Sequence, residues 1–381
     1  AGGTPAKLNG TLFSGGQVNS FLISPNSSRV VFLANQGTTS GNELYRVPLA
    51  GGSATKVNGT LPGGGQVGDY AIAPDSIRVL YVADQNARGV NELFRAPLAA
   101  PGPVARLNDP LASGADIWGY EITPDSEYVF YVADQTRPDR NDLYRARLDG
   151  HDNPTRLSQG LPGDYIIYDM EVTADAAWVV FEAQVSSEPD AIYSVPVAGG
   201  VPMLLNTPTI ANARLHYFRL SPDGQTVVYR GVEDTGGAWE IFSVPVDGST
   251  AQVRLNGVLV PGGEVQDVAI APNSARVVYT ADQQADDVVE LFSVPIGGGA
   301  ATKLNTTLPA YADVQQFYLS PNGAWVAYLA DVDTDEVTEL YLVPTNGSAA
   351  PVKLNGPLTA EGDVQGLSLI HISEPTRRTP I

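Results

Sequence analysis

Alternating aspartates form the most suggestive chemical pattern in the chain. Asp331, Asp333 and Asp335 occupy every second position of one acidic segment. Carboxylates with this spacing open many calcium loops, because Ca²⁺ prefers hard oxygen ligands. The glycine and the later glutamate that complete such a loop are missing, and Leu342 stands where the glutamate would be. We therefore expect a solvated acidic hairpin and no cofactor, with Ca²⁺ at these three aspartates as the alternative.

Histidines offer little support for catalysis. His151 lies in a turn-like segment, and His216 precedes Tyr217 and Phe218 in an apolar stretch. Neither is accompanied by the Gly-x-Ser-x-Gly segment that presents a serine nucleophile. The chain has no cysteine, so thiol nucleophiles and thiolate metal sites are excluded. We expect no catalytic residues, and the chain is predicted not to be an enzyme.

Charge restricts the partners. The 381 residues include 22 Lys+Arg and 42 Asp+Glu, which gives a net charge of -20. Such a surface repels polyanions, so nucleic acid is not an expected partner. No apolar run reaches the roughly 18 residues that a membrane-spanning helix needs. The partners that remain are a protein, a glycan or a cationic ligand.

Two landmarks repeat along the chain at steps of 48 to 50 residues. The first is a Leu-Asn dipeptide, which becomes Val57-Asn58 in one copy and Leu157-Ser158 in another. The second is a Ser-Pro-Asp/Asn type of turn, whose proline is replaced once by Ala174. Regular self-similarity of this length indicates a repeat architecture. The landmark residues are Asn9, Asn58, Asn108, Asn206, Asn256, Asn305 and Asn355, and Pro25, Pro74, Pro124, Pro222, Pro272 and Pro321.

Each repeat contains four β-type segments and no helical periodicity. In the clearest copy we predict strands at residues 67–72, 78–83, 92–98 and 105–108, separated by turn residues. The second segment is almost continuously apolar, as expected when both faces of a sheet are buried. Four antiparallel strands per repeat are typical of a β-propeller blade. The predicted fold class is therefore an all-β propeller.

The repeat resembles the TolB-like, PD40-type repeats of bacterial exported β-propellers. The residues that carry the resemblance are Ser221-Pro222-Asp223-Gly224 with Ile241-Phe242, and Ser320-Pro321-Asn322-Gly323 with Leu340-Tyr341. The resemblance covers residues 4–366 and implies a periplasmic or extracellular location. It is specific for the fold and says little about function.

The two ends depart from the repeat. Residues 367–381 resemble a translated transposase end and sequencing adapter, so we expect an artefactual tail after a single propeller domain at residues 1–366. The first residues match a segment between repeats, which suggests truncation at both ends. Seven blades are favoured, and a native ring of eight is the alternative.

Residues that recur with the period are expected to serve the scaffold. These are the aspartate of Ala-Asp-Gln at Asp84, Asp134 and Asp282, and the arginine of Leu-Tyr-Arg or Leu-Phe-Arg at Arg46, Arg95 and Arg145. Variation between copies is concentrated after the second segment, where loops can differ while the scaffold stays fixed. The candidate binding residues on this acidic loop face are Asp282, Asp286, Asp287, Asp331, Asp333 and Asp335.

The function predicted from these features is that of a non-catalytic, exported binding or scaffold propeller that uses its acidic loop face. Two alternatives are enzymatic. One is the gating propeller of a larger prolyl-oligopeptidase-like peptidase, and the other is a lyase or glycosidase that uses carboxylates of the channel.

Overall fold

The structure is a computed structural model. It describes residues 6–12, 14–36, 41–112, 114–137, 140–185, 189–207, 210, 213–309, 312–333, 337–358, 362–364 and 366. The predicted tail at residues 367–381 and the candidate ligand Asp335 lie outside the described residues. Among those that are described, no helix is long and apolar enough to cross a membrane.

The described residues form seven four-stranded antiparallel sheets, which confirms the predicted seven-bladed, all-β propeller. We number these blades 1 to 7 in chain order and call their strands first to fourth. Blades 1 to 4 consist of β1 Val18–Ile23, β2 Arg29–Ala34, β3 Glu43–Pro48 and β4 Thr55–Lys56; β5 Val67–Ile72, β6 Arg78–Ala83, β7 Glu92–Pro97 and β8 Ala105–Arg106; β9 Ile117–Ile122, β10 Tyr128–Ala133, β11 Asp142–Arg147 and β12 Thr155–Arg156; and β13 Tyr165–Val172, β14 Trp178–Val185, β15 Ala191–Pro196 and β16 Met203–Leu204. Blades 5 to 7 consist of β17 Arg214–Leu220, β18 Thr226–Val232, β19 Glu240–Pro245 and β20 Val253–Arg254; β21 Val265–Ile270, β22 Arg276–Ala281, β23 Glu290–Pro295 and β24 Thr302–Lys303; and β25 Val314–Leu319, β26 Trp325–Ala330, β27 Glu339–Pro344 and β28 Val352–Lys353.

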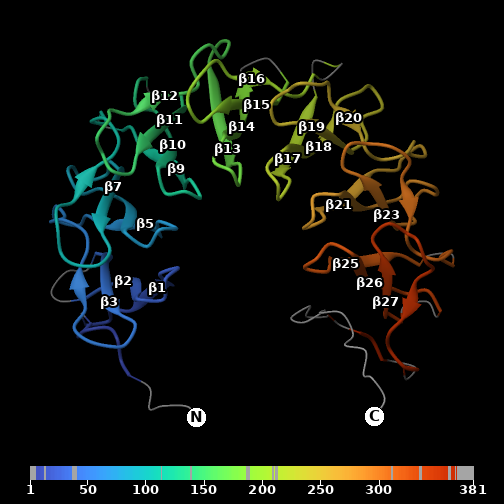
Figure 1. The fold of residues 1–381 in the computed structure, drawn as a ribbon, viewed down its shortest axis with the longest axis horizontal. Coiled ribbons are helices and arrows are strands. Elements are labelled where there is room, and N and C mark those ends of the chain that lie inside the picture. The colour runs from blue at the N-terminus through green and yellow to red at the C-terminus, as the bar shows by residue number, and fades with distance from the viewer. Residues whose placement is uncertain are drawn as a thin grey trace, which may run out of the picture. The chain divides into compact units, whose positions relative to one another are not determined.

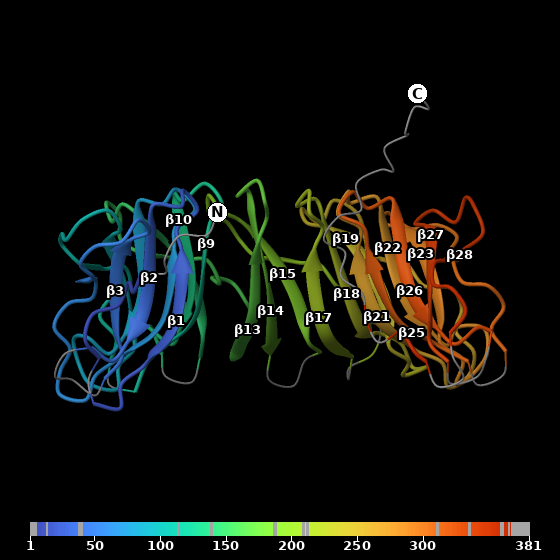
Figure 2. The same cartoon turned by 90° about the horizontal axis from the view of Figure 1, so that it is seen from below.

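The chain divides into two compact units. Unit 1 comprises Ala1–Ser186 and Val195–Pro202, and unit 2 comprises Ser187–Ser194 and Met203–Ile381. Figure 1 shows that the sheets within each unit follow one another in chain order, and Figure 2 shows β1, β2 and β3 side by side within blade 1.

The cores lie between consecutive blades of the same unit. In unit 1, Val31 and Leu44 of blade 1 pack with Val79 and Tyr81 of blade 2. In unit 2, Val278 and Leu291 of blade 6 belong to a core with residues of blade 7. The second strand is therefore buried on both faces, which explains its nearly continuous apolar sequence.

The proline landmark marks a tight turn between the first and second strands. In blade 2 the amide of Ser76 donates a 2.8 Å hydrogen bond to the carbonyl of Ala73, across Pro74 and Asp75. Ser76 has φ 58°, and the equivalent residue of blade 5 is Gly224, with φ 71°. A positive φ favours glycine, which accounts for the final letter of the SPDG copies. The Ser76 hydroxyl also accepts a 3.1 Å hydrogen bond from the Asn26 amide, which ties blade 2 to blade 1.

Recurrent asparagines and arginines hold strands together. In blade 2, Asn108 Oδ1 accepts a 2.8 Å hydrogen bond from the Leu93 amide, while its Nδ2 donates to the carbonyl of Asp109. In blade 4, Asn206 makes the equivalent 2.7 Å bond to Ile192. Arg95 reaches the next blade and donates a 2.8 Å bond to the carbonyl of Asp149. These residues therefore fix the scaffold.

A β-bulge interrupts the pairing of the first and second strands. In blade 3, Ile117 pairs with Ala133 and Gly119 with Val132, so Trp118 is left without a partner in the register. A bulge redirects the side chain of its extra residue and often occurs next to functional sites. We call the skipped residue the bulge residue. In blades 1 to 5 and 7 it is Asn19, Gly68, Trp118, Tyr168, His216 and Gln315.

Candidate binding sites

The recurrent aspartates cap the end of the second strand. Asp84 Oδ1 accepts a 2.6 Å hydrogen bond from the Gln66 amide, and Oδ2 accepts one of 3.1 Å from the Gly89 amide. Asp282 and Asp331 receive equivalent bonds from Glu264 and Asp313, at 2.6 and 2.8 Å. Both of these candidate binding residues are buried, each with 6% of its surface exposed. Their carboxylates thus bind the protein's own backbone.

The other described candidates lie at the surface. Asp286, Asp287 and Asp333 are exposed, and the Asp333 carboxylate lies 2.9 Å from Nζ of Lys353. Among the described residues there is no group of three or more acidic, histidine or cysteine side chains that could hold a metal ion. Asp335, the third residue of the alternative Ca²⁺ site, is outside that part of the chain.

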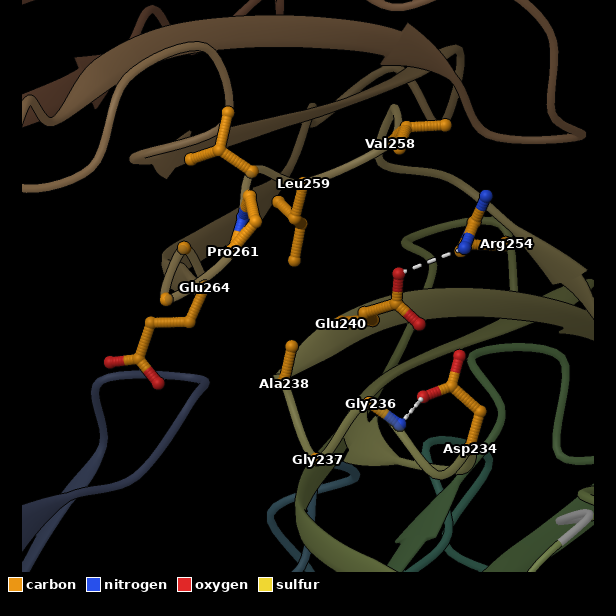
Figure 3. A pocket seen from close by; sticks show the side chains of 13 residues that line it. Asp234, Gly236, Gly237, Ala238, Glu240, Arg254, Val258, Leu259, Pro261 and Glu264 are labelled. Atoms are coloured by element: carbon orange, nitrogen blue, oxygen red, sulfur yellow. Dashed lines mark hydrogen bonds and ion pairs between the residues drawn. The ribbon is translucent and has the colours of Figure 1, made fainter.

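A hollow of about 430 Å³ lies within unit 2, between the loops of blades 5 and 6. One side is formed by the loop after β18, and the other by the segment that leads into β21. Figure 3 shows Glu240 and Ala238 on the blade 5 side, opposite Leu259 and Pro261. Asp286 is close to this hollow, because a Cβ on Gly262 would lie 2.7 Å from its Oδ1.

The charged residues that line the unit 2 hollow are mostly acidic. Asp234, Glu240 and Glu264 line it, and Arg254 is the one basic residue among the lining residues described. Glu240 is buried, and its Oε1 lies 3.0 Å from Arg254 Nη1 and accepts a 3.2 Å bond from Asn256. Asp234 is exposed and Glu264 is half-buried. The hollow is therefore suited to a cationic group.

Blade 5 carries an arginine and aromatic cluster beside this hollow. Arg230 is buried, and its Nε donates a 2.7 Å hydrogen bond to the Val265 carbonyl, while Nη1 lies 2.9 Å from Nδ1 of the bulge residue His216. The guanidinium also lies 4.8 Å from the Trp239 ring centroid, and Arg214 lies 5.0 Å from the same ring. Burial lowers the pKa of Arg230. Val232 occupies the position that the capping aspartate Asp84 has in blade 2. Blade 5 therefore departs from the repeat at this position.

The remaining described histidine is solvated. The His151 side chain is 80% exposed, and its Nδ1 lies 3.1 Å from the Asp149 carboxylate. It lies in the turn between the third and fourth strands of blade 3.

The bulges also form a hollow within unit 1 that the sequence reasoning missed. It measures about 250 Å³ and is lined by the first strands of blades 3 and 4, β9 and β13, including Trp118 and Tyr168. These rings are 63% and 59% exposed. Comparing bulge positions across repeats could have found them, but that needs the strand register, which the sequence does not give directly.

Glu121 is the distinctive carboxylate of the unit 1 hollow. Its Oε2 accepts a 3.1 Å hydrogen bond from the Val172 amide. Burial raises the pKa of Glu121 to about 7, and the carboxylates of Glu171 and Asp169 add to the rise. The carboxyl group is therefore partly protonated near neutral pH.

No protein-family profile and no curated protein sequence matches the chain. Solved structures that are similar include a prolyl endopeptidase, with 13% identity and a TM-score of 0.46 over 89% of this chain and 49% of that one. Oligogalacturonate lyase from Vibrio parahaemolyticus has 12% identity and a TM-score of 0.44 over 90% and 88% of the two chains. TolB from Acinetobacter baumannii has 18% identity and a TM-score of 0.35 over 61% and 52%. The chain thus spans about half the length of the prolyl endopeptidase, and identities this low carry no function across.

Proposed function

We propose that this chain is a non-catalytic binding propeller that holds a cationic group of a protein partner in the acidic hollow of unit 2. The observation that carries the proposal is the charge of this hollow's lining, in which Asp234, Glu240 and Glu264 outnumber the one lining arginine, Arg254. Arg254 is already paired with Glu240, and Glu264 lies 3.9 Å from Arg230 of the adjacent cluster. A net negative charge remains to attract a lysine or arginine side chain of the partner.

The state of the neighbouring polar groups supports binding over catalysis. Glu240 is held by Arg254 and Asn256, and His216 is in contact with Arg230. A general base needs a lone pair that can reach the substrate. Groups that are held in this way suit recognition better than proton transfer.

The proposal includes export to the periplasm or the cell exterior. The resemblance of the repeat to those of exported bacterial propellers supports this location. Fractionation of cells that express the complete gene, followed by immunodetection in the periplasmic and cytoplasmic fractions, tests it. Retention of the protein in the cytoplasm would contradict this part.

The binding proposal is tested by titrating the protein with a pentalysine peptide, and with pentaglutamate as the opposite-charge control, by isothermal titration calorimetry. The double variant Asp234→Asn/Glu264→Gln should weaken pentalysine binding about tenfold, because two nearby countercharges are removed. The matched control is Asp109→Asn/Glu127→Gln, which removes two exposed carboxylates of unit 1. An equal loss in both double variants would show that only the overall charge matters.

A further inference from the structure

The hollow of unit 1 lies between two bulged first strands. Trp118 and Gly119 come from β9, and Tyr168, Asp169 and Met170 come from β13. All of these residues belong to unit 1. Two neighbouring bulges therefore direct one aromatic side chain each to the same hollow.

The scaffold does not require aromatic residues at these positions. Asn19, Gly68 and Gln315 occupy the bulge position in other blades whose four-stranded sheets are equally complete. Trp118 and Tyr168 are more than half exposed, so they gain little from burial in the folded protein. Exposed rings that line a concave surface indicate contact with a ligand.

The charge of the hollow determines whether that ligand is a cation or an anion. Glu121 and Asp169 line it, and no lysine or arginine is among the described residues that do so. Burial raises the pKa of Glu121, and the negative charges of Glu171 and Asp169 raise it further. An anionic ligand would add to this repulsion, whereas a cation would relieve it.

We propose that the unit 1 hollow binds an organic cation of the ammonium or guanidinium type, which Trp118 and Tyr168 contact through their ring faces and Glu121 and Asp169 neutralise. Aromatic faces attract such cations through the ring quadrupole, and tryptophan does so most strongly. Both a free amine and a lysine or arginine side chain have this chemistry. The site is separate from the unit 2 hollow and does not depend on it.

The indole resonances of the protein provide a direct test. The chain has four tryptophans, so a ¹H–¹⁵N spectrum should show four indole signals, and the one absent from Trp118→Phe identifies Trp118. Agmatine and tetramethylammonium should both shift this signal. The same titration with a pentapeptide that has one central lysine identifies the source of the cation. Tighter binding of the pentapeptide indicates a peptide side chain, and tighter binding of agmatine indicates a free amine.

Variants separate a binding role from a structural one. Trp118→Ala should weaken agmatine binding by about tenfold, in line with a desolvated cation–π contact. Glu121→Gln should weaken it several-fold and preserve the fold, because glutamine retains an acceptor for the Val172 amide. The control is Trp325→Ala, which removes another partly exposed tryptophan, in β26, and should leave binding unchanged.

Three results would overturn the proposal. The first is a Trp118 signal that does not respond to either cation while the far-ultraviolet circular dichroism shows a folded protein. The second is a response to the neutral disaccharide cellobiose with none to agmatine, which would assign the rings to sugar stacking. Loss of agmatine binding in Asp234→Asn/Glu264→Gln, with full binding in Trp118→Ala, would also contradict it and would place the cation in the unit 2 hollow.

Discussion

The capping aspartate and the bulge residue lie at the same end of the paired first and second strands of a blade. Their side chains nevertheless have different roles. Asp84, Asp134, Asp282 and Asp331 are buried and accept backbone hydrogen bonds. The bulge residue changes from Asn19 to Gly68, Trp118 and Tyr168 without any loss of the sheet. In this chain, residues that recur build the blade, and positions that vary on a fixed backbone are free to contact a ligand.

The largest effect should follow from removing a cap. Asp84→Ala leaves the amides of Gln66 and Gly89 without their acceptor, since both bonds end on this carboxylate. We expect a loss of about 2–3 kcal/mol in the free energy of unfolding, measured by denaturant titration. Asp84→Asn, which keeps one acceptor oxygen, should lose less. Equal stability of the alanine variant and the parent protein would refute the scaffold role.

An intermediate effect is expected at the ion pair between the third and fourth strands. Arg106 Nη1 lies 2.7 Å from the buried carboxylate of Glu92, whereas blade 4 has Ala191 and Leu204 at these positions. Arg106→Leu should cost about 1–2 kcal/mol of unfolding free energy, because Glu92 is left buried without its countercharge.

The double variant Glu92→Ala/Arg106→Leu reproduces the blade 4 arrangement. It should be more stable than Arg106→Leu alone in the same denaturant titration. A double variant that is less stable than the single one would show that Glu92 stabilises the blade even without Arg106, contrary to this prediction.

Much of the scaffold could be predicted from the sequence because each structural demand is repeated. The predicted strands at residues 67–72 and 78–83 match β5 and β6 in full, while the fourth strand, predicted at residues 105–108, is only Ala105–Arg106. The side chain of Asn108 explains the shorter strand, since it bonds to Leu93 as the ladder ends.

The candidate sites were harder to predict. The acidity of the loops is visible in the sequence, but the burial of Asp282 and Asp331 is not, because an acidic residue after a strand can either face water or cap a backbone. The exposure of Trp118 is not visible either, because the bulge that leaves it without a cross-strand partner can be located only from the strand register.

The pH dependence of the free energy of unfolding should reveal the raised pKa of Glu121 in the unit 1 hollow. Its folded-state pKa of about 7 lies above the ordinary value of 4.5, mainly through burial and with help from Glu171 and Asp169. The folded protein therefore holds this proton more tightly than the unfolded chain, and the resulting stability is lost as the pH rises from 4.5 to 7. Glu121→Gln cannot ionise, so its free energy of unfolding should rise relative to the parent over this range. Parallel pH profiles of the two proteins would show that Glu121 has an ordinary pKa.

The smallest effect on stability should come from the bulge residue. Trp118→Ala should change the free energy of unfolding by less than about 0.5 kcal/mol, because 63% of the side chain is already exposed. Tyr168→Ala should cost slightly more, since its hydroxyl donates a 3.1 Å hydrogen bond to Gln184. Denaturant titration of both variants beside Asp84→Ala measures the contrast directly. A Trp118→Ala loss as large as that of Asp84→Ala would mean that the ring supports the blade, and its exposure would then no longer point to a ligand.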